Sequence, residues 1–219
     1  MRALACPASL KGVLGAGEAA ALLARGMRSG GAEAVELPVA DGGEGTAAVL
    51  AAALGGEWRE TQARDPLGRR VGARYLLLPD GTAVLESAEA IGLGRLVPDE
   101  LDPLAASSAG LGDLVLAAVA STPRSLLVCL GGSATVDGGA GLLSVVPEAP
   151  AGVPIRVACD VRSPLLGERG AARVFGPQKG AGPDAVEELE RRLAAMAELA
   201  PYRDVPGALP SRVERSTVP

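Results

Sequence analysis

Short apolar runs alternate with longer helical patterns through the first part of the chain. The runs RALAC and AVELPV, at residues 2–6 and 34–39, are typical of buried strands. The segments EAAALLARGM and TAAVLAAAL, at residues 18–27 and 46–54, have the length and apolar content of helices. This strand–helix order predicts an α/β fold with a mostly parallel sheet, helices on its faces and ligands at the carboxyl ends of its strands.

The middle of the chain adds a hairpin and two more strands. The runs VGARYLLL and TAVLESA, joined by the turn 79–81, predict a hairpin that makes the sheet mixed. A helical stretch through Leu114, Val115 and Ala118 follows, and the runs SLLVCL and PIRVACD read as later strands. The fold class expected is therefore α/β, with mostly parallel or mixed sheets flanked by helices.

The last helix carries the clearest signals. Pro183 suits a first helical position, and Asp184 suits the positive end of the helix dipole. Apolar residues recur at three- and four-residue spacing, at Val186, Leu189, Leu193 and Met196. Two ion pairs are expected on the solvent face, Glu187 with Arg191 and Glu188 with Arg192. We interpret these charges as a solvated surface and not as a site.

Composition narrows the classes of ligand. With 48 % hydrophobic and 21 % charged residues, the chain is globular. One Trp, two Tyr and one Phe offer no platform for stacking bases, and a net charge of -5 disfavours binding to nucleic acid or an anionic membrane. No apolar run approaches the roughly 20 residues that span a bilayer, so we expect a cytoplasmic protein with a small ligand.

The chain has no histidine, and its three cysteines, Cys6, Cys129 and Cys159, each end an apolar run. We expect these cysteines at the ends of buried strands, with neither disulfides nor zinc. Without imidazole, proton transfer near neutral pH depends on carboxylates or lysine. This composition favours carboxylate and Mg²⁺ chemistry.

Only two of the 21 basic residues are lysine, Lys11 in SLKG and Lys179 in GPQKGAG. Lysine is a compact point charge on a flexible stem and reaches a phosphate or carboxylate from one side. An arginine-rich genome would also leave a few lysines by chance. The glycine-rich setting of both favours a role in a site.

Two loops combine an aspartate with a glycine pair between a strand and a helix. They are Ala40–Thr46, called here the Asp41 loop, and Gly131–Gly141, called the Gly131 loop. Glycines let backbone N–H groups approach an anion closely, and the acids add a metal ligand or a base. One such turn is ordinary α/β architecture, whereas two favour a site. The candidate binding residues are Gly42, Gly43, Glu44, Gly131, Gly132, Ser133, Thr135, Asp137 and Gly138.

Two further regions carry acids. Asp160 closes a predicted strand, which is where a parallel sheet places a catalytic acid. Glu86 and Glu89 follow an apolar run in ESAEAIGL, and a helix cap explains either glutamate about as well as a site does. The P-loop pattern GxxxxGK[ST] is absent, which excludes Walker-type ATP binding, and the fragments GAGEAA and GAGPDA match a dinucleotide fingerprint only loosely. A dinucleotide-dependent dehydrogenase is therefore disfavoured.

Seven segments, in order along residues 7–200, resemble the bacterial glycerate kinases, which phosphorylate D-glycerate with ATP. They are PASLKG, LPVADGGEGT, DPLGRRV, ESAEAIGL, LGGSATVDGGAG, ACDVRSPLLG and VFGPQKGA. The resemblance implies two α/β domains with the substrates meeting between them. Residues 1–70 would begin the first domain, residues 71–200 would form the second, and 201–219 would be an irregular tail.

The resemblance also implies roles for the candidate residues. Asp41 or Asp160 would accept the proton of the glycerate hydroxyl, and Asp41 and Asp137 would bind Mg²⁺. Lys11 and Lys179 would neutralise the glycerate carboxylate and the transferred phosphoryl group. The Gly131 loop, together with Gln178, would bind phosphate or substrate. Whether the 2- or the 3-hydroxyl is phosphorylated, and the oligomeric state, are not decided by the sequence.

The chain also departs from the family pattern. Ala8 stands where relatives usually have aspartate, and the stretch 143–153 is shorter than in relatives. Relatives continue beyond residue 219 with a segment that completes the first domain, and we hypothesise a change of reading frame near Ala208, which sequencing of the gene would test. The alternative to an active kinase is thus a non-catalytic remnant that binds glycerate or nucleotide without turnover.

Overall fold

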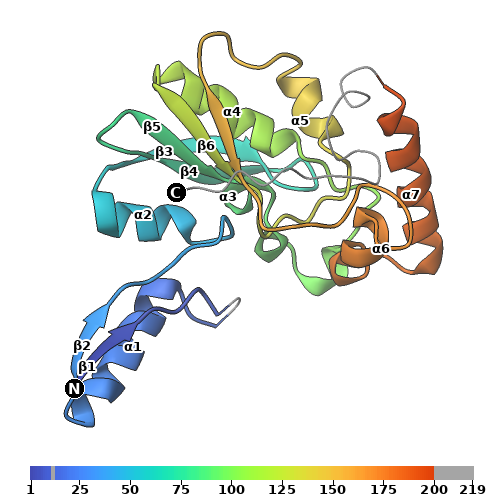
Figure 1. Ribbon diagram of the computed structural model, residues 1–219. Coiled ribbons are helices and arrows are strands. Elements are labelled where there is room, and N and C mark those ends of the chain that lie inside the picture. Colours follow the sequence, from blue (N-terminus) through green and yellow to red (C-terminus); the bar gives the residue numbers. More distant parts are fainter. Residues whose placement is uncertain (11–12, 200–219) are drawn as a thin grey trace.

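Two β-sheets organise the part of the chain that the structure, a computed structural model, describes: residues 1–10 and 13–199 (Figure 1). The smaller sheet holds two strands and the larger one five. The strands are β1 Arg2–Ala5, β2 Glu33–Glu36, β3 Glu57–Arg64, β4 Arg70–Leu77, β5 Thr82–Glu86, β6 Ser125–Cys129 and β7 Ile155–Ala158. The α-helices are α1 Ala16–Ser29, α2 Thr46–Leu54, α3 Ala88–Ile91, α4 Ala109–Ala120, α5 Ala140–Val145, α6 Ala171–Phe175 and α7 Pro183–Ala197. Three 3₁₀ turns are η1 Leu93–Arg95, η2 Pro98–Glu100 and η3 Pro177–Lys179.

The smaller unit is a strand–helix–strand crossover that lies apart from the larger sheet in Figure 1. β1 and β2 run parallel, as the strand–helix order of the sequence predicts, and Arg2 lies opposite Glu33. Helix α1 buries a row of small residues at helical spacing, namely Ala16, Ala19, Ala20 and Ala24. Leu4 and Val35 on the strands remain more than half exposed. The helix therefore covers only part of the apolar surface of this unit.

The larger sheet is mixed and has the strand order β3-β4-β5-β6-β7. β4 and β5 form the antiparallel hairpin that the turn at 79–81 predicts, and β5, β6 and β7 run parallel. The sequence EWRETQAR of β3 lacks a buried apolar run, and the sequence patterns missed this strand. It pairs with β4 along eight residues at the edge of the sheet, where a mostly polar strand is tolerated because one side faces solvent.

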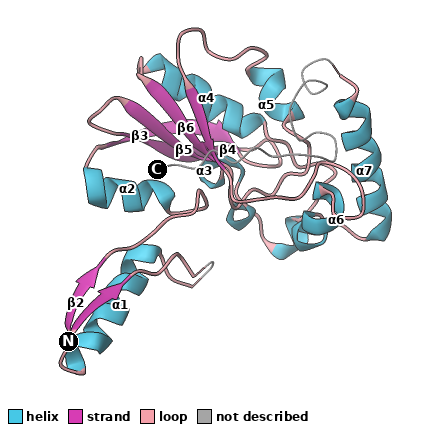
Figure 2. Ribbon diagram, in the orientation of Figure 1, coloured by secondary structure: helices cyan, strands magenta, loops and turns pink. Residues whose placement is uncertain are grey.

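The alternation of side chains along β5 assigns each of its residues to one face of the larger sheet. Ala83 and Leu85 pack in the core cluster that contains residues of α4. Val84 packs on the other face with Ala47 of α2. Figure 2 shows the sheet with helices on both sides, as predicted from the sequence. Because successive side chains alternate, Glu86 lies on the same face as Val84 and points toward α2.

Helix α7 confirms the periodicity read from the sequence. Val186, Leu189 and Leu193 are buried in one cluster with Val136 of the Gly131 loop. Of the expected ion pairs, Arg192 binds Glu188 with a separation of 2.7 Å. The other pairing was wrong: Glu187 binds Arg173 of α6 at 2.6 Å, and Arg191 binds Glu188 at 2.5 Å. The contact between α6 and α7 offers Glu187 a partner that helical spacing alone does not reveal.

Two of the three cysteines are exposed, whereas the sequence predicted all three at the ends of buried strands. Cys129 is buried at the end of β6, but Cys6 and Cys159 are exposed. Both exposed thiols follow directly after the last residue of a strand, where the chain leaves the sheet. Among the described residues, no helix is long and apolar enough to cross a membrane.

Lys11 and the tail 201–219 lie outside the described residues. Residues 57–64, assigned by the resemblance to the first domain, form a strand of the same sheet as residues 70–77. The division into two domains stays a prediction.

Candidate functional site

The Asp41 loop and the Gly131 loop touch each other where β6 ends. The N–H of Gly131 donates to the carbonyl oxygen of Gly42 at 3.1 Å. A Cβ atom on Gly131 would lie 2.4 Å from the Cα of Gly43, a distance that no side chain permits. Glycine at position 131 therefore serves the close approach of two backbones.

The Asp41 loop also touches the end of β7, the strand that precedes Asp160. Gly42 has a φ of +86°, and a Cβ atom there would lie 2.9 Å from the Cβ of Ala158. Asp41 directly precedes Gly42, Asp160 follows Ala158 by two residues, and both aspartates are exposed. The structure thus brings the segments that carry the two aspartates together at the carboxyl ends of β6 and β7, where α/β sheets bind ligands.

Several backbone N–H groups in or just after the Asp41 loop are bound within the protein. Gly43 N–H donates to Asp41 Oδ1 at 2.9 Å. Gly45 N–H donates to Glu86 Oε2 at 3.1 Å, and Ala47 N–H donates to Glu86 Oε1 at 2.5 Å. These bonds disfavour the cradling of a phosphate by the same N–H groups. The binding roles of Gly42, Gly43 and Glu44 stay predictions.

Glu86 is a buried carboxylate at the end of β5, with 5 % of its surface exposed. Burial raises the pKa of its carboxyl, the bonds from Ala47 and Gly45 oppose that rise, and the nearby Glu89 and Glu44 add to it. Its two bonds stabilise the charge at the positive end of α2. The sequence left open a helix cap or a site role for Glu86. Its two hydrogen bonds go to the start of α2, about 40 residues earlier in the chain, and not to the helix that follows it.

The middle of the Gly131 loop lies over the ammonium of Lys179. Lys179 Nζ donates to Thr135 O at 2.7 Å and to Ser133 Oγ at 3.3 Å. The side chain is buried, and burial lowers the pKa of Lys179 to about 8, while the charge of Asp137 acts in the opposite direction. The structure therefore places a partly desolvated positive charge directly beneath this loop.

Asp137 fastens the far end of the Gly131 loop. Its carboxylate accepts from the N–H of Ser108 at 2.8 Å and from the hydroxyl of Ser108 at 2.7 Å. It also accepts from Gly139 N–H at 3.1 Å and from Gly141 N–H at 3.0 Å. A carboxylate offers about four acceptor positions, so these bonds disfavour Mg²⁺ binding by Asp137. The metal role of Asp137 stays a prediction.

The segment that follows β5 borders the Gly131 loop. Leu93 N–H donates to Gly132 O, and Ala134 N–H donates to Ile91 O, each at 2.8 Å. A hollow of about 170 Å³ lies beside this contact. It is lined by Glu44, Glu86, Ala88, Glu89, Gly92, Gly94 and Arg95. Of the candidate binding residues, this hollow includes only Glu44, and Glu86 and Glu89, for which the sequence left a site role open, line it as well.

Arg95 is the residue of this hollow that sequence reasoning missed. Its guanidinium donates to Gly72 O at 3.0 Å and lies 3.8 Å from the carboxylate of Glu89, which also binds Arg74 at 3.1 Å. One arginine among many carries no local sequence signal. Only the fold brings this one beside the Gly131 loop.

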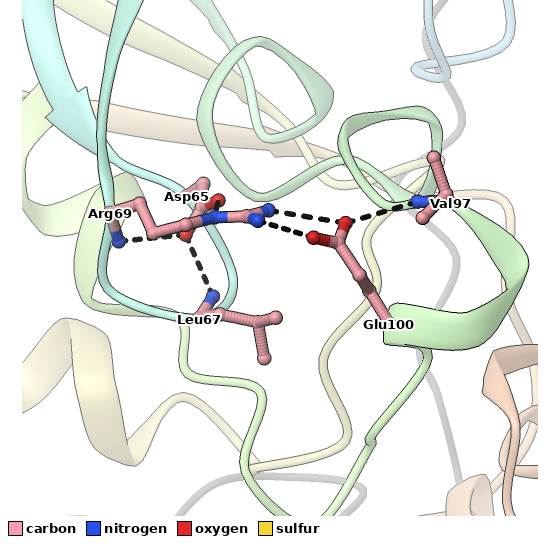
Figure 3. Close-up of polar contacts among 5 residues, drawn as sticks. All are labelled: Asp65, Leu67, Arg69, Val97 and Glu100. Carbon is pink, nitrogen blue, oxygen red and sulfur yellow. Dashed lines mark hydrogen bonds and ion pairs between the residues drawn. The ribbon is translucent and has the colours of Figure 1, made fainter.

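A buried carboxylate, Asp65, binds the half-exposed guanidinium of Arg69 in the turn between β3 and β4 (Figure 3). Asp65 is 2 % exposed, binds the guanidinium of Arg69 and accepts from Leu67 N–H at 2.9 Å. Arg69 in turn binds Glu100 at 2.5 Å, and Glu100 accepts from Val97 N–H at 3.2 Å. The network fastens the β3–β4 turn to η2.

The residue after η2, Leu101, lies against Gly180, the neighbour of Lys179. Gly180 has a φ of +98°, and a Cβ atom there would lie 2.7 Å from the Cβ of Leu101. Gln178, on the other side of Lys179, is exposed, and no bond links it to the Gly131 loop. Its predicted binding role stays a prediction.

Other hollows and acid clusters add nothing to this site. A larger, open hollow of about 590 Å³ lies on the smaller unit and contains none of the predicted residues. Within residues 1–10 and 13–199, no group of three or more carboxylates or thiols is arranged to hold a metal ion. Mg²⁺ is commonly bound by one or two carboxylates together with substrate phosphates, so this arrangement still fits that ion.

The fold and the paired glycine loops define an α/β protein without a P-loop, whose candidate ligand site lies at the carboxyl ends of parallel strands. The model of the glycerate kinase family matches residues 3–146 and 143–208. The chain belongs to the glycerate kinase family, which confirms the resemblance drawn from its motifs.

Individual relatives agree with this assignment. Glycerate 2-kinase of Escherichia coli and glycerate kinase of Bacillus subtilis are each 37 % identical to the chain over 95 % of its residues. The crystal structure of putative glycerate kinase 2 from Salmonella typhimurium matches with a TM-score of 0.73 at 34 % identity, over 90 % of this chain and 62 % of that one. The chain spans about 65 % of the length of the two curated relatives.

Proposed function

We propose that this chain takes part in the ATP-dependent phosphorylation of D-glycerate to phosphoglycerate. The observation that carries the proposal is the meeting of the Asp41 loop, the Gly131 loop and the end of β7, in a chain of the glycerate kinase family. Phosphoryl transfer depends mainly on positioning and on neutralising charge. The segments that meet there carry exposed aspartates, and Lys179 lies beneath the Gly131 loop.

The exposed aspartates would handle the proton. Asp41 or Asp160 would accept the proton of the attacking glycerate hydroxyl, because each is exposed beside the junction of the loops. One oxygen of Asp41 already accepts from Gly43, which fixes the orientation of the carboxylate and leaves its second oxygen toward solvent or substrate. Lys11 would neutralise the carboxylate of glycerate.

Lys179 would act on the phosphoryl group through the Gly131 loop. Its ammonium already binds Thr135 and Ser133, so its charge would attract an anion to the loop while the loop backbone and the Ser133 hydroxyl make the contacts. This assignment keeps the electrostatic role proposed for Lys179 from the sequence.

Asp41 fits Mg²⁺ better than Asp137 does. Mg²⁺ prefers oxygen ligands, and the exposed carboxylate of Asp41 offers them, whereas the carboxylate of Asp137 is filled by four hydrogen bonds. When bound, the ion would neutralise charge on the phosphates of ATP.

The test is a coupled assay of ADP formation by the purified chain with D-glycerate, ATP and Mg²⁺. ADP formation that depends on D-glycerate is expected. A folded protein that binds glycerate or ATP and forms no ADP above background would refute catalysis and favour the non-catalytic alternative. Analysis of the product by NMR would distinguish phosphorylation at the 2-hydroxyl from phosphorylation at the 3-hydroxyl.

A further inference from the structure

We infer that Glu86 is a positioning residue, which holds the Asp41 loop in the geometry needed for phosphoryl transfer. The inference rests on the proposed function. It starts from the alternation along β5, which directs Glu86 to the face of the sheet that α2 covers. A carboxylate at the end of this strand meets the beginning of α2, the helix that follows the Asp41 loop.

The contacts of Glu86 fix the backbone of that loop. Both of its carboxylate oxygens accept from the backbone, one from Gly45 at 3.1 Å and the other from Ala47 at 2.5 Å. Gly45 has a φ of +91°, a conformation that favours glycine and in which its N–H points toward the carboxylate. With two bonds from a side chain that is 95 % buried, the loop has little freedom to shift.

Ser87, the residue that directly follows β5, holds the second loop. Ser87 Oγ donates to Gly131 O at 3.1 Å, and Gly131 N–H donates to Gly42 O at the same distance. Two adjacent residues, the last of β5 and the one that follows it, therefore connect both loops. The position of Asp41 relative to the Gly131 loop depends on this connection, because Asp41 directly precedes Gly42.

A cap that served helix stability alone would come from a residue next to α2 in the chain. Glu86 instead lies 41 residues beyond Gly45 and is nearly inaccessible to water. Burial of a carboxylate costs free energy, and a local, exposed cap would avoid that cost. A distant, buried carboxylate is explained if its role is to join the Asp41 loop to the larger sheet through the bonds to Gly45 and Ala47.

The experiment compares the wild-type chain with Glu86→Gln, which keeps the volume and one acceptor but turns an NH₂ group toward one of the two backbone donors. Hydrogen exchange at the Gly45 and Ala47 amides should become at least about tenfold faster. The kcat per folded molecule should fall by about 10- to 100-fold, as expected when a reacting group is displaced by about an ångström. KM for D-glycerate and for ATP should change by less than about threefold, because both oxygens of Glu86 are bound to backbone N–H groups.

A matched control and a second variant complete the design. Glu187→Gln also removes one carboxylate, from a surface ion pair with Arg173, and should leave the exchange at the loop and kcat unchanged. If Glu86→Gln does not fold, Ser87→Ala serves in its place, and the exchange of the Gly131 amide should become faster.

Three outcomes decide the inference. Unchanged exchange at the two amides in Glu86→Gln, or a kcat per folded molecule within threefold of the wild type, would overturn it; for Ser87→Ala, unchanged exchange of the Gly131 amide would do so. If the wild-type chain forms no ADP, the proposed function fails, and the exchange data still decide whether Glu86 holds the loop.

Discussion

Replacement of Lys179 by methionine tests two effects of this lysine separately: the loss of stability caused by burying its charge, and the contribution of that charge to activity. Burial lowers the pKa of the folded ammonium from 10.5 to about 8. This difference corresponds to about 3 kcal/mol by which the folded state disfavours the charged form. Methionine has a similar length and carries no charge, so Lys179→Met removes this cost together with the bond to Thr135.

The effect on stability has a definite direction with pH. Between pH 8 and 10.5 the unfolded chain retains the lysine proton while the folded chain has lost it, so the unfolded state binds more protons. Stability of the wild type should therefore rise with pH in this window, by about 3 kcal/mol relative to Lys179→Met. Below pH 8 the difference between the two proteins should be constant.

At pH 7 two effects of Lys179→Met oppose each other. Relief of charge burial favours the variant, while the carbonyl of Thr135 loses its partner at a cost of about 1–3 kcal/mol. We expect the two unfolding free energies to lie within about 2 kcal/mol, although ADP formation by the variant should be lost.

Urea unfolding followed by circular dichroism from pH 6 to 10.5 measures both proteins under the same conditions. Ionisable groups that titrate equally in the wild type and the variant cancel in the difference between the two unfolding free energies. A difference in unfolding free energy that stays flat from pH 7 to 10.5 would refute the claim that Lys179 is held with a lowered pKa. A variant that keeps full activity would refute the electrostatic role of the residue.

Three further predictions follow from the same contacts. Asp41→Asn should lower kcat by about 10²- to 10⁴-fold if this residue accepts the proton. The urea midpoint should change little, because the amide oxygen of the asparagine still accepts from Gly43 N–H. Asp137→Ala should lower the unfolding free energy by about 2–3 kcal/mol because it leaves the Ser108 and loop donors unpaired, whereas a residue that only bound Mg²⁺ would leave stability unchanged. Asp65→Asn should lower the unfolding free energy by about 1–3 kcal/mol, because the buried carboxylate that accepts from Leu67 and Arg69 becomes a neutral amide, while the half-exposed Arg69 keeps Glu100 as a partner. Burial raises the pKa of the Asp65 carboxyl, but the bonds from Arg69 and Leu67 outweigh burial and lower the pKa overall. The stabilisation by Asp65 should therefore be present above about pH 4 and decline below that value, which urea unfolding at a series of pH values would measure.

The candidate site shows which features can be read from motifs. The glycine pairs and their aspartates are visible in the sequence because close backbone contact and turn conformations demand particular residues, as Gly42 and Gly131 illustrate. Their order along the chain also identified the family, which the family model confirms. The sequence does not reveal which carboxylates are already filled by hydrogen bonds within the protein. The bonds of Asp137, for example, come partly from Ser108, 29 residues away.

The amino-acid sequence by itself determined the elements that carry a strong local signal. Helix α7 follows from its spacing, because burial of one stripe requires that spacing. The β4–β5 hairpin and the strands β5 to β7 follow from a turn and from short apolar runs, such as the fully buried β5. The polar strand β3 has no such signal, and its place was decided by pairing with β4 at the edge of the sheet.

Tertiary structure decided the partners. Glu86 caps a helix that precedes it by about 40 residues, Glu187 binds α6 instead of its own helix, and Lys179 is buried beneath a loop that begins 48 residues before it. Periodicity reports which face of an element is buried. It does not report what lies against that face, because this depends on the order in which the strands join the sheet.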